Sequence, residues 1–151
     1  MNLSAPIENM NELTMPLSVG QNFSRSVAFS ADSIKQFAVM AGDPNPLHHD
    51  DEIAKASRFG RLIAAGTQTT TMLAGAVAWN LCRLKPSLGL EMSFKFRRAI
   101  LVDEVLKAKW QITEIKHNCH LGGDIVTIDC ELRNEHNFLL VQGTVVSLVI
   151  D

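Results

Sequence analysis

The stretch TQTTTMLAGAVAWNL, residues 67–81, decides the fold class of this chain. Its larger apolar side chains Met72, Leu73 and Val77 recur at helical spacing, and most positions between them hold alanine or glycine. A helix that is apolar or small nearly all round is buried in the protein interior. We therefore expect a long helix that begins around Thr67 and forms the centre of the fold.

Four segments after this helix have the composition of strands, and they span residues 88–96, 105–115, 125–133 and 138–150. In the second segment Leu106, Ala108 and Trp110 alternate with Lys107 and Lys109, which is typical of an antiparallel sheet with one solvated face. With a shorter strand over 21–29, the pattern predicts an α+β domain whose antiparallel sheet wraps around one long helix. One small sheet cannot cover both sides of that helix, so we expect a homodimer or a higher homo-oligomer.

The region between the first strand and the long helix should hold two shorter helices. Ser30 is a predicted N-cap, and Gly42 is expected to end the helix that follows it. Acidic residues in the first turn predict another short helix over residues 50–57. Residues 1–18 are expected to form an extended lead-in, and residues 19–151 a single domain.

Length and composition exclude several classes of protein. The 151 residues suffice for one compact domain, and 46% of them are hydrophobic, which is unlike a disordered chain. A net charge of -2 argues against nucleic acid as a partner, and the pair Arg97-Arg98 is too short to change this. No stretch reaches the roughly 18 to 20 apolar residues that cross a bilayer. We therefore expect neither a nucleic-acid nor a membrane partner.

Cysteine and tyrosine usage narrows the chemistry. Tyrosine is absent, which excludes tyrosine-based acid catalysis. Cys82, Cys119 and Cys130 are widely spaced and lack a C-x-x-C pair, so we expect neither a disulfide framework nor a zinc site. These features favour a reduced compartment, and we expect a cytoplasmic protein without a bound metal.

The loop GDPNPLH, residues 42–48, carries the strongest chemical signal. Two prolines stiffen it and can hold Asp43 and His48 in one place. A carboxylate only accepts hydrogen bonds, whereas an imidazole donates or accepts, so the pair could grip and polarise a water molecule. On spacing alone, Asp43 could equally cap a turn and His48 could be an ordinary loop histidine.

Gly66 stands immediately before the long helix. The free N–H groups and the positive dipole end of a helix can receive a developing oxyanion. Read alone, Gly66 could equally be a plain turn glycine.

The segment FAVMAGDPNPLH (residues 37–48), followed by Ala54, Phe59-Gly60 and IAAG (residues 63–66), resembles the hydratase 2 motif of the MaoC-like, (R)-specific enoyl-CoA hydratases. The resemblance runs from about Val19 to Ile150 and includes residues 94–98. It implies a hot-dog fold, usually dimeric, with a coenzyme A or acyl-carrier thioester as substrate. In that family the residues matching Asp43 and His48 hold the catalytic water, and the amide matching Gly66 binds the thioester oxygen.

Three further residues complete the expected substrate site, namely Asn45, Ala65 and Thr67. Relatives often carry histidine where this chain has Ala65, and some carry serine where it has Ala74. The missing imidazole should leave space beside the thioester, so we expect a substrate that is bulkier near C2 or C3.

The resulting hypothesis is hydration of a trans-2-enoyl thioester to the (R)-3-hydroxyacyl thioester, or the reverse dehydration. No cofactor is expected, because the thioester carbonyl is itself the electron sink. The alternatives are a hot-dog acyl thioesterase, whose water attacks the carbonyl, and an acyl-thioester-binding accessory protein that has lost catalysis.

Overall fold

The computed structural model describes residues 12–151. Its elements are, in order, β1 (Asn22–Val27), α1 (Ala31–Ala41), the 3-10 helix η1 (Pro46–His48), α2 (Asp51–Ala56), α3 (Gly66–Cys82), β2 (Ser87–Phe96), β3 (Leu106–Asn118), β4 (Gly123–Asn134) and β5 (Leu139–Ile150). The predicted lead-in lies outside the described residues as far as residue 11, and residues 12–18 contain no helix or strand. Leu13 nevertheless belongs to the buried core.

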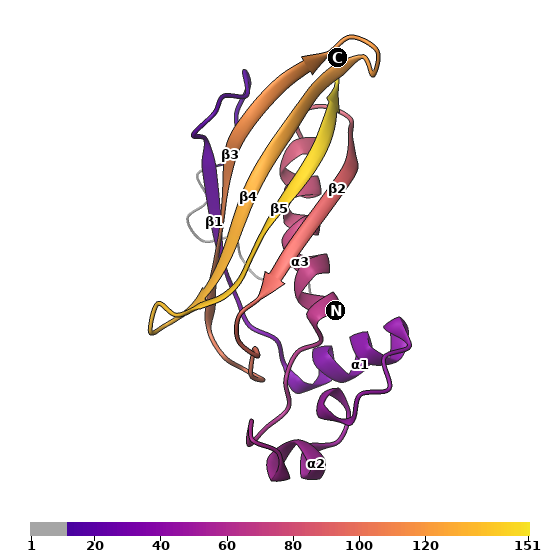
Figure 1. Ribbon diagram of the computed structural model, residues 1–151, viewed down its shortest axis with the longest axis vertical. Coiled ribbons are helices and arrows are strands. Elements are labelled where there is room, and N and C mark those ends of the chain that lie inside the picture. Colours follow the sequence, from indigo (N-terminus) through magenta and orange to yellow (C-terminus); the bar gives the residue numbers. More distant parts are fainter. Residues whose placement is uncertain (1–11) are drawn as a thin grey trace.

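The five strands form one antiparallel sheet in the order β1-β3-β4-β5-β2. The long helix α3 lies along one face of this sheet, and α1 and α2 gather near the end of α3 where it begins (Figure 1). The predicted α+β architecture, an antiparallel sheet around one long helix, is confirmed. The loop before α2 contains one element that was not predicted, the single turn η1.

The core lies between α3 and the sheet. Leu73, Val77 and Leu81 form the fully buried stripe of α3, at the spacing of successive helical turns. Trp110 of β3 donates a hydrogen bond from Nε1 to the Leu73 carbonyl at 3.0 Å, and Phe23 of β1 stacks on its ring with centroids 4.8 Å apart. The alternation predicted for β3 is therefore confirmed, with the apolar residues turned to α3 and the lysines turned to the opposite face.

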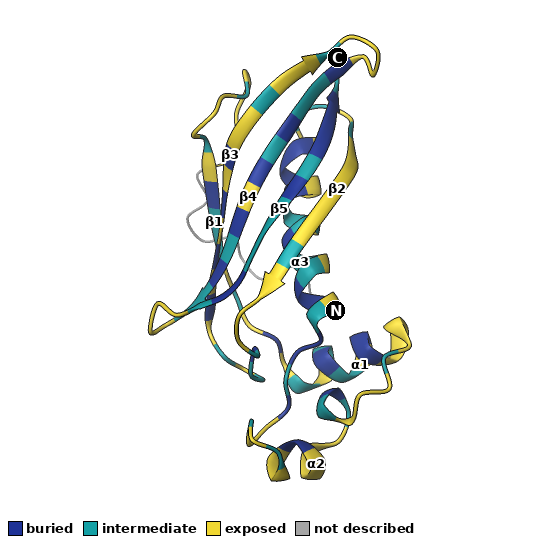
Figure 2. Ribbon diagram, in the orientation of Figure 1, coloured by how far each residue is buried: buried dark blue, intermediate teal, exposed yellow. Residues whose placement is uncertain are grey.

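One side of α3 and most of β2 remain exposed. Thr71, Gly75 and Trp79 are exposed at a spacing of four residues along α3. The edge strand β2 is exposed along most of its length (Figure 2), and Met92 is 61% accessible. A single copy of the chain therefore does not cover its central helix all round. Among residues 12–151, no helix is long and apolar enough to cross a membrane.

Candidate active site

Asp43 is placed by the end of α1. Ser30 caps the start of this helix, as predicted, and the helix ends at Gly42 in the left-handed conformation with φ 67°, which suits glycine. The Asp43 N–H then donates to the Ala38 carbonyl at 2.9 Å, and the Asp43 Oδ1 accepts from the Asn45 N–H at 3.0 Å. Both the backbone and the carboxylate of Asp43 are thus held.

His48 closes the turn η1 and is only 5% exposed. The turn is capped by Asn45, whose Oδ1 accepts from the Leu47 N–H at 3.1 Å. The Nδ1 of His48 lies 2.8 Å from the carbonyl oxygen of Ile63. A carbonyl can only accept, so Nδ1 carries a proton and Nε2 is the acceptor of the neutral ring.

The Nε2 of His48 faces the Oδ2 of Asp43 at 3.5 Å. This separation exceeds the length of about 2.7–2.9 Å that is usual for a charge-assisted hydrogen bond. Both atoms are acceptors while the ring is neutral, so they can accept the two hydrogens of one water molecule. The adjacent His49 supports the loop, because its Nε2 lies 2.6 Å from the Asp43 carbonyl oxygen and can donate to it.

Gly66 is the first residue of α3, and the segment before it is anchored from two sides. The Ile63 N–H donates to the Leu47 carbonyl at 3.2 Å, and the Ala64 N–H donates to the Ile100 carbonyl at 2.9 Å. The first N–H groups of a helix have no partner within the helix. Within the described part of the chain, the Gly66 N–H has no hydrogen-bond acceptor, which leaves it available to an anionic oxygen.

A cavity of about 370 Å³ brings the two halves of this site together. His48 and Gly66 both line it, together with Thr69 and Phe96. The Phe96 ring packs so closely over Gly66 that a methyl group there would lie 3.1 Å from it. The remaining lining residues are Arg58, Phe59, Ile63, Ala64, Arg97, Arg98, Ala99 and Ile100.

Comparison with known proteins assigns the chain to a family. Residues 14–129 match the sequence profile of the MaoC like domain. The chain belongs to this family. The (R)-specific enoyl-CoA hydratase of Aeromonas caviae is 28% identical over 130 residues, which cover 86% of this chain and 93% of that enzyme. A UPF0336 protein of Parafrankia is 31% identical over 144 residues, with 86% and 92% coverage.

Two solved structures share the architecture of this MaoC-like chain. The (R)-hydratase of A. caviae superposes with a TM-score of 0.80 at 26% identity, over 90% of this chain and 99% of that one. A 3R-hydroxyacyl-ACP dehydratase complex from Mycobacterium tuberculosis has a TM-score of 0.74 at 19% identity, over 86% and 96%. The predicted hot-dog fold is thereby confirmed, and the family is one of hydratases and dehydratases.

In the structure of this MaoC-like chain, only some of the predicted site residues lie at the cavity. His48 and Gly66 line the cavity, and Asp43 lies beside His48. Asn45 and Thr67 are exposed and do not line it. Ala65 is completely buried, and the cavity wall is formed by its neighbours on both sides instead. The side chain of Ala65 is packed in the interior, and the preference for a substrate that is bulkier near C2 or C3 stays a prediction.

Sequence reasoning missed several lining residues. Thr69 lies one helical turn into α3 and is 1% exposed, but it is one of three consecutive threonines, and nothing in the sequence distinguishes it from Thr70 and Thr71. Arg58 and Phe96 come from segments that are distant from each other in sequence, and only the fold brings them to one cavity. The pair Arg97-Arg98 lies within the segment 94–98 that carries the resemblance, but the sequence predicted no role for it at the cavity.

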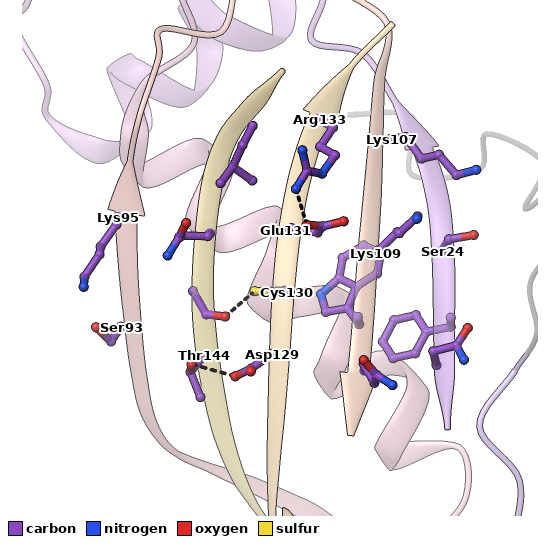
Figure 3. A pocket seen from close by; sticks show the side chains of 17 residues that line it. Ser24, Ser93, Lys95, Lys107, Lys109, Asp129, Cys130, Glu131, Arg133 and Thr144 are labelled. Carbon is purple, nitrogen blue, oxygen red and sulfur yellow. Dashed lines mark hydrogen bonds and ion pairs between the residues drawn. The ribbon is translucent and has the colours of Figure 1, made fainter. Parts of the chain in front are cut away.

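A second hollow, of about 830 Å³, lies on the face of the sheet opposite α3 (Figure 3). Its acidic side chains already have partners, because Arg133 donates to Glu131 at 2.9 Å and Thr144 donates to Asp129 at 2.8 Å. The hydrogen bond from Arg133 holds the pKa of Glu131 below its usual range. Burial raises the pKa of the Cys130 thiol in the same region to about 12, which keeps it protonated and unreactive. The smaller cavity, with His48, is therefore the candidate active site.

Proposed function

We propose that this protein adds water to trans-2-enoyl thioesters to form (R)-3-hydroxyacyl thioesters, or catalyses the reverse dehydration. The observation that carries the proposal is the pair formed by Asp43 Oδ2 and His48 Nε2, 3.5 Å apart beside a cavity that also contains the start of α3. The R configuration is inferred from the name of the A. caviae relative, which is similar over most of both chains.

The acid-base step follows from the hydrogen bonds of His48. Because Nδ1 donates to the Ile63 carbonyl, the lone pair of Nε2 is free to accept a proton from water. The Asp43 carboxylate holds the same water and orients its oxygen towards C3 of the enoyl group. As the oxygen–C3 bond forms, the π electrons move to the thioester carbonyl, and a proton returned by the pair is added to C2.

The start of α3 supports the other half of the reaction. The carbonyl oxygen gains negative charge as water adds, and a preorganised N–H is the usual means of stabilising such an oxygen. The Gly66 N–H points out of the first turn of the helix and has the positive dipole end behind it. The thioester carbonyl is the electron sink, so this mechanism requires neither a metal nor a redox cofactor.

We further propose that the protein is a homodimer that pairs through β2. This strand has a free edge, and its exposed side chains include Leu88, Leu90, Met92 and Phe96. A long apolar edge strand invites pairing with another strand, and an exposed apolar patch of this kind marks an interface. A second copy would also cover the exposed side of α3.

The proposed location is the cytoplasm. All three cysteines are free, namely the exposed Cys82 and Cys119 and the buried Cys130, and free cysteines are typical of a reducing compartment.

The decisive experiment is an assay of the purified protein with crotonyl-CoA. A hydratase removes the absorbance of the conjugated enoyl thioester without releasing thiol, and the product can be checked for the R configuration. A thioesterase would release free coenzyme A, and a binding protein would do neither. The variants Asp43→Asn and His48→Ala, with Lys107→Gln as a control on the opposite face of the sheet, assign the activity to the cavity.

A further inference from the structure

Three arginines gather at the rim of the active-site cavity. Arg58 comes from the turn after α2, whereas Arg97 and Arg98 follow the end of β2. All three are exposed, although they line the same cavity as the buried His48. The fold therefore brings together three positive charges from two separate segments at the mouth of one cavity.

None of these arginines is neutralised within the part of the chain that the structure describes. Among residues 12–151, no ion pair involves Arg58, Arg97 or Arg98. Two other arginines, Arg83 and Arg133, do pair with glutamates. Two of the three guanidinium groups stack on aromatic rings instead. Arg58 lies over Phe59 at 4.9 Å and Arg98 over Phe138 at 4.5 Å, which orients each charge without cancelling it.

The interior of the cavity differs from its rim. Thr69, Ala64 and Ile100 are 1%, 8% and 4% exposed, and the inner wall that they form with His48 carries no arginine. A ligand that fits this arrangement has an uncharged end beside His48 and a strongly anionic part that remains near the solvent.

We propose that Arg58, Arg97 and Arg98 form a subsite for the phosphate groups of the carrier to which the acyl chain is attached. This proposal rests on the proposed function, since it takes the substrate to be an acyl thioester. A phosphate accepts several charge-assisted hydrogen bonds, and arginine guanidinium groups match its oxygens in pairs. A carboxylate on the acyl chain is disfavoured because the arginines lie at the rim and not on the buried wall.

Binding measured by calorimetry tests the subsite without any need for turnover. Coenzyme A, 4′-phosphopantetheine and pantetheine share the thiol arm and differ in their phosphates. Arg97→Gln, Arg98→Gln and Arg58→Gln should each weaken the binding of coenzyme A by roughly five- to tenfold, the low end for exposed charge-assisted contacts. The affinity for pantetheine, which has no phosphate, should change by less than about twofold.

Phosphopantetheine identifies which phosphate is bound. If the arginine variants bind both phosphopantetheine and coenzyme A more weakly, the subsite binds the phosphate that coenzyme A shares with the prosthetic arm of carrier proteins. If the variants bind only coenzyme A more weakly, the subsite binds the phosphates of the nucleotide part of coenzyme A. Lys107→Gln removes the same charge from the opposite face of the sheet and should leave all three affinities unchanged.

Two results would overturn the subsite. One is an equal loss of affinity for pantetheine and coenzyme A, and the other is no loss for either compound. A failure of the proposed reaction is distinguishable from both. If coenzyme A binding depends on the arginines but crotonyl-CoA is not hydrated, the proposed hydratase activity is refuted and the phosphate subsite is supported. If crotonyl-CoA is hydrated but coenzyme A binding does not depend on the arginines, the subsite is refuted and the hydratase activity is supported.

Discussion

Replacing Gly66 with alanine separates the catalytic role of this residue from its structural one. Gly66 is the first residue of α3 and does not have a positive φ, so its backbone conformation is open to alanine. An added Cβ would lie 3.1 and 3.3 Å from two atoms of the Phe96 ring, where ordinary contacts are 3.4–4 Å. The ring must therefore move by a few tenths of an ångström.

The cost of this movement should be small. Phe96 is 53% exposed at the end of an edge strand, so its ring can turn towards solvent. Alanine is favoured over glycine in helices by up to about 1 kcal/mol, which offsets part of the contact strain. We expect the free energy of unfolding to change by less than about 1 kcal/mol, a Tm shift within roughly 4 °C for a chain of this size.

Catalysis should respond far more strongly than stability. Alanine keeps the backbone N–H that is proposed to bind the thioester oxygen, so the new methyl group acts by crowding the cavity wall beside that N–H and displacing the oxygen from it. Complete loss of one such donor costs about 100-fold or more in kcat, and we expect the displacement to approach that loss. Thermal unfolding and the crotonyl-CoA assay on Gly66→Ala measure both quantities. Nearly normal turnover with an unchanged Tm would contradict the placement of the thioester oxygen against this part of the cavity wall. A fall in Tm of more than about 8 °C would show that the Phe96 ring cannot move aside.

Four other outcomes follow from the structure. Asp43→Asn and His48→Ala should each lower kcat by at least about 100-fold with an unchanged circular dichroism spectrum, and the double variant should lose little more, because residues that act as a unit are not additive. Gly143→Ala should lower the Tm by roughly 6–12 °C, since its Cβ would overlap a backbone carbonyl of β2 at a cost of about 3 kcal/mol. Met92→Asp should convert a dimer into monomers in light scattering, because it places a charge on the exposed edge strand. Cys130 should resist a thiol reagent at pH 8 until the protein unfolds, while the two exposed cysteines react at once. The raised pKa of Cys130 should also make the free energy of unfolding fall as the pH rises from 9 to 12, because in this range only the thiol of the unfolded chain is ionised.

The elements were predictable because each is defined by signals that are local in sequence. Ser30 and Gly42 mark the two ends of α1 by capping and by left-handed geometry, and both interactions are present. The alternation in β3 identified its buried face, because the pleat sends successive side chains to opposite sides. The turn η1 was missed because a proline-rich stretch of seven residues favours a loop and a single 3-10 turn about equally.

The site was only partly predictable, because a cavity is lined by residues that are far apart in the chain. The motif located Asp43, His48 and Gly66, and the distance between the first two depends on local turn geometry. The environment of Ala65 depends on how the segment before α3 packs between two other loops, and no local pattern contains that information. The position of Arg58 opposite residues 97–98 is likewise a product of the tertiary fold.

Phe96 links the proposed interface to the proposed chemistry. It is the last residue of β2, the strand whose free edge should bind a second copy, and its ring covers Gly66 at the start of α3. Within one copy the strand end is exposed, so little besides β5 and Gly66 restrains it. A partner along β2 would fix the strand and hold the ring against the helix. Assembly should therefore shape the wall of the cavity, and a monomeric variant such as Met92→Asp should lose activity even though Met92 itself does not line the cavity.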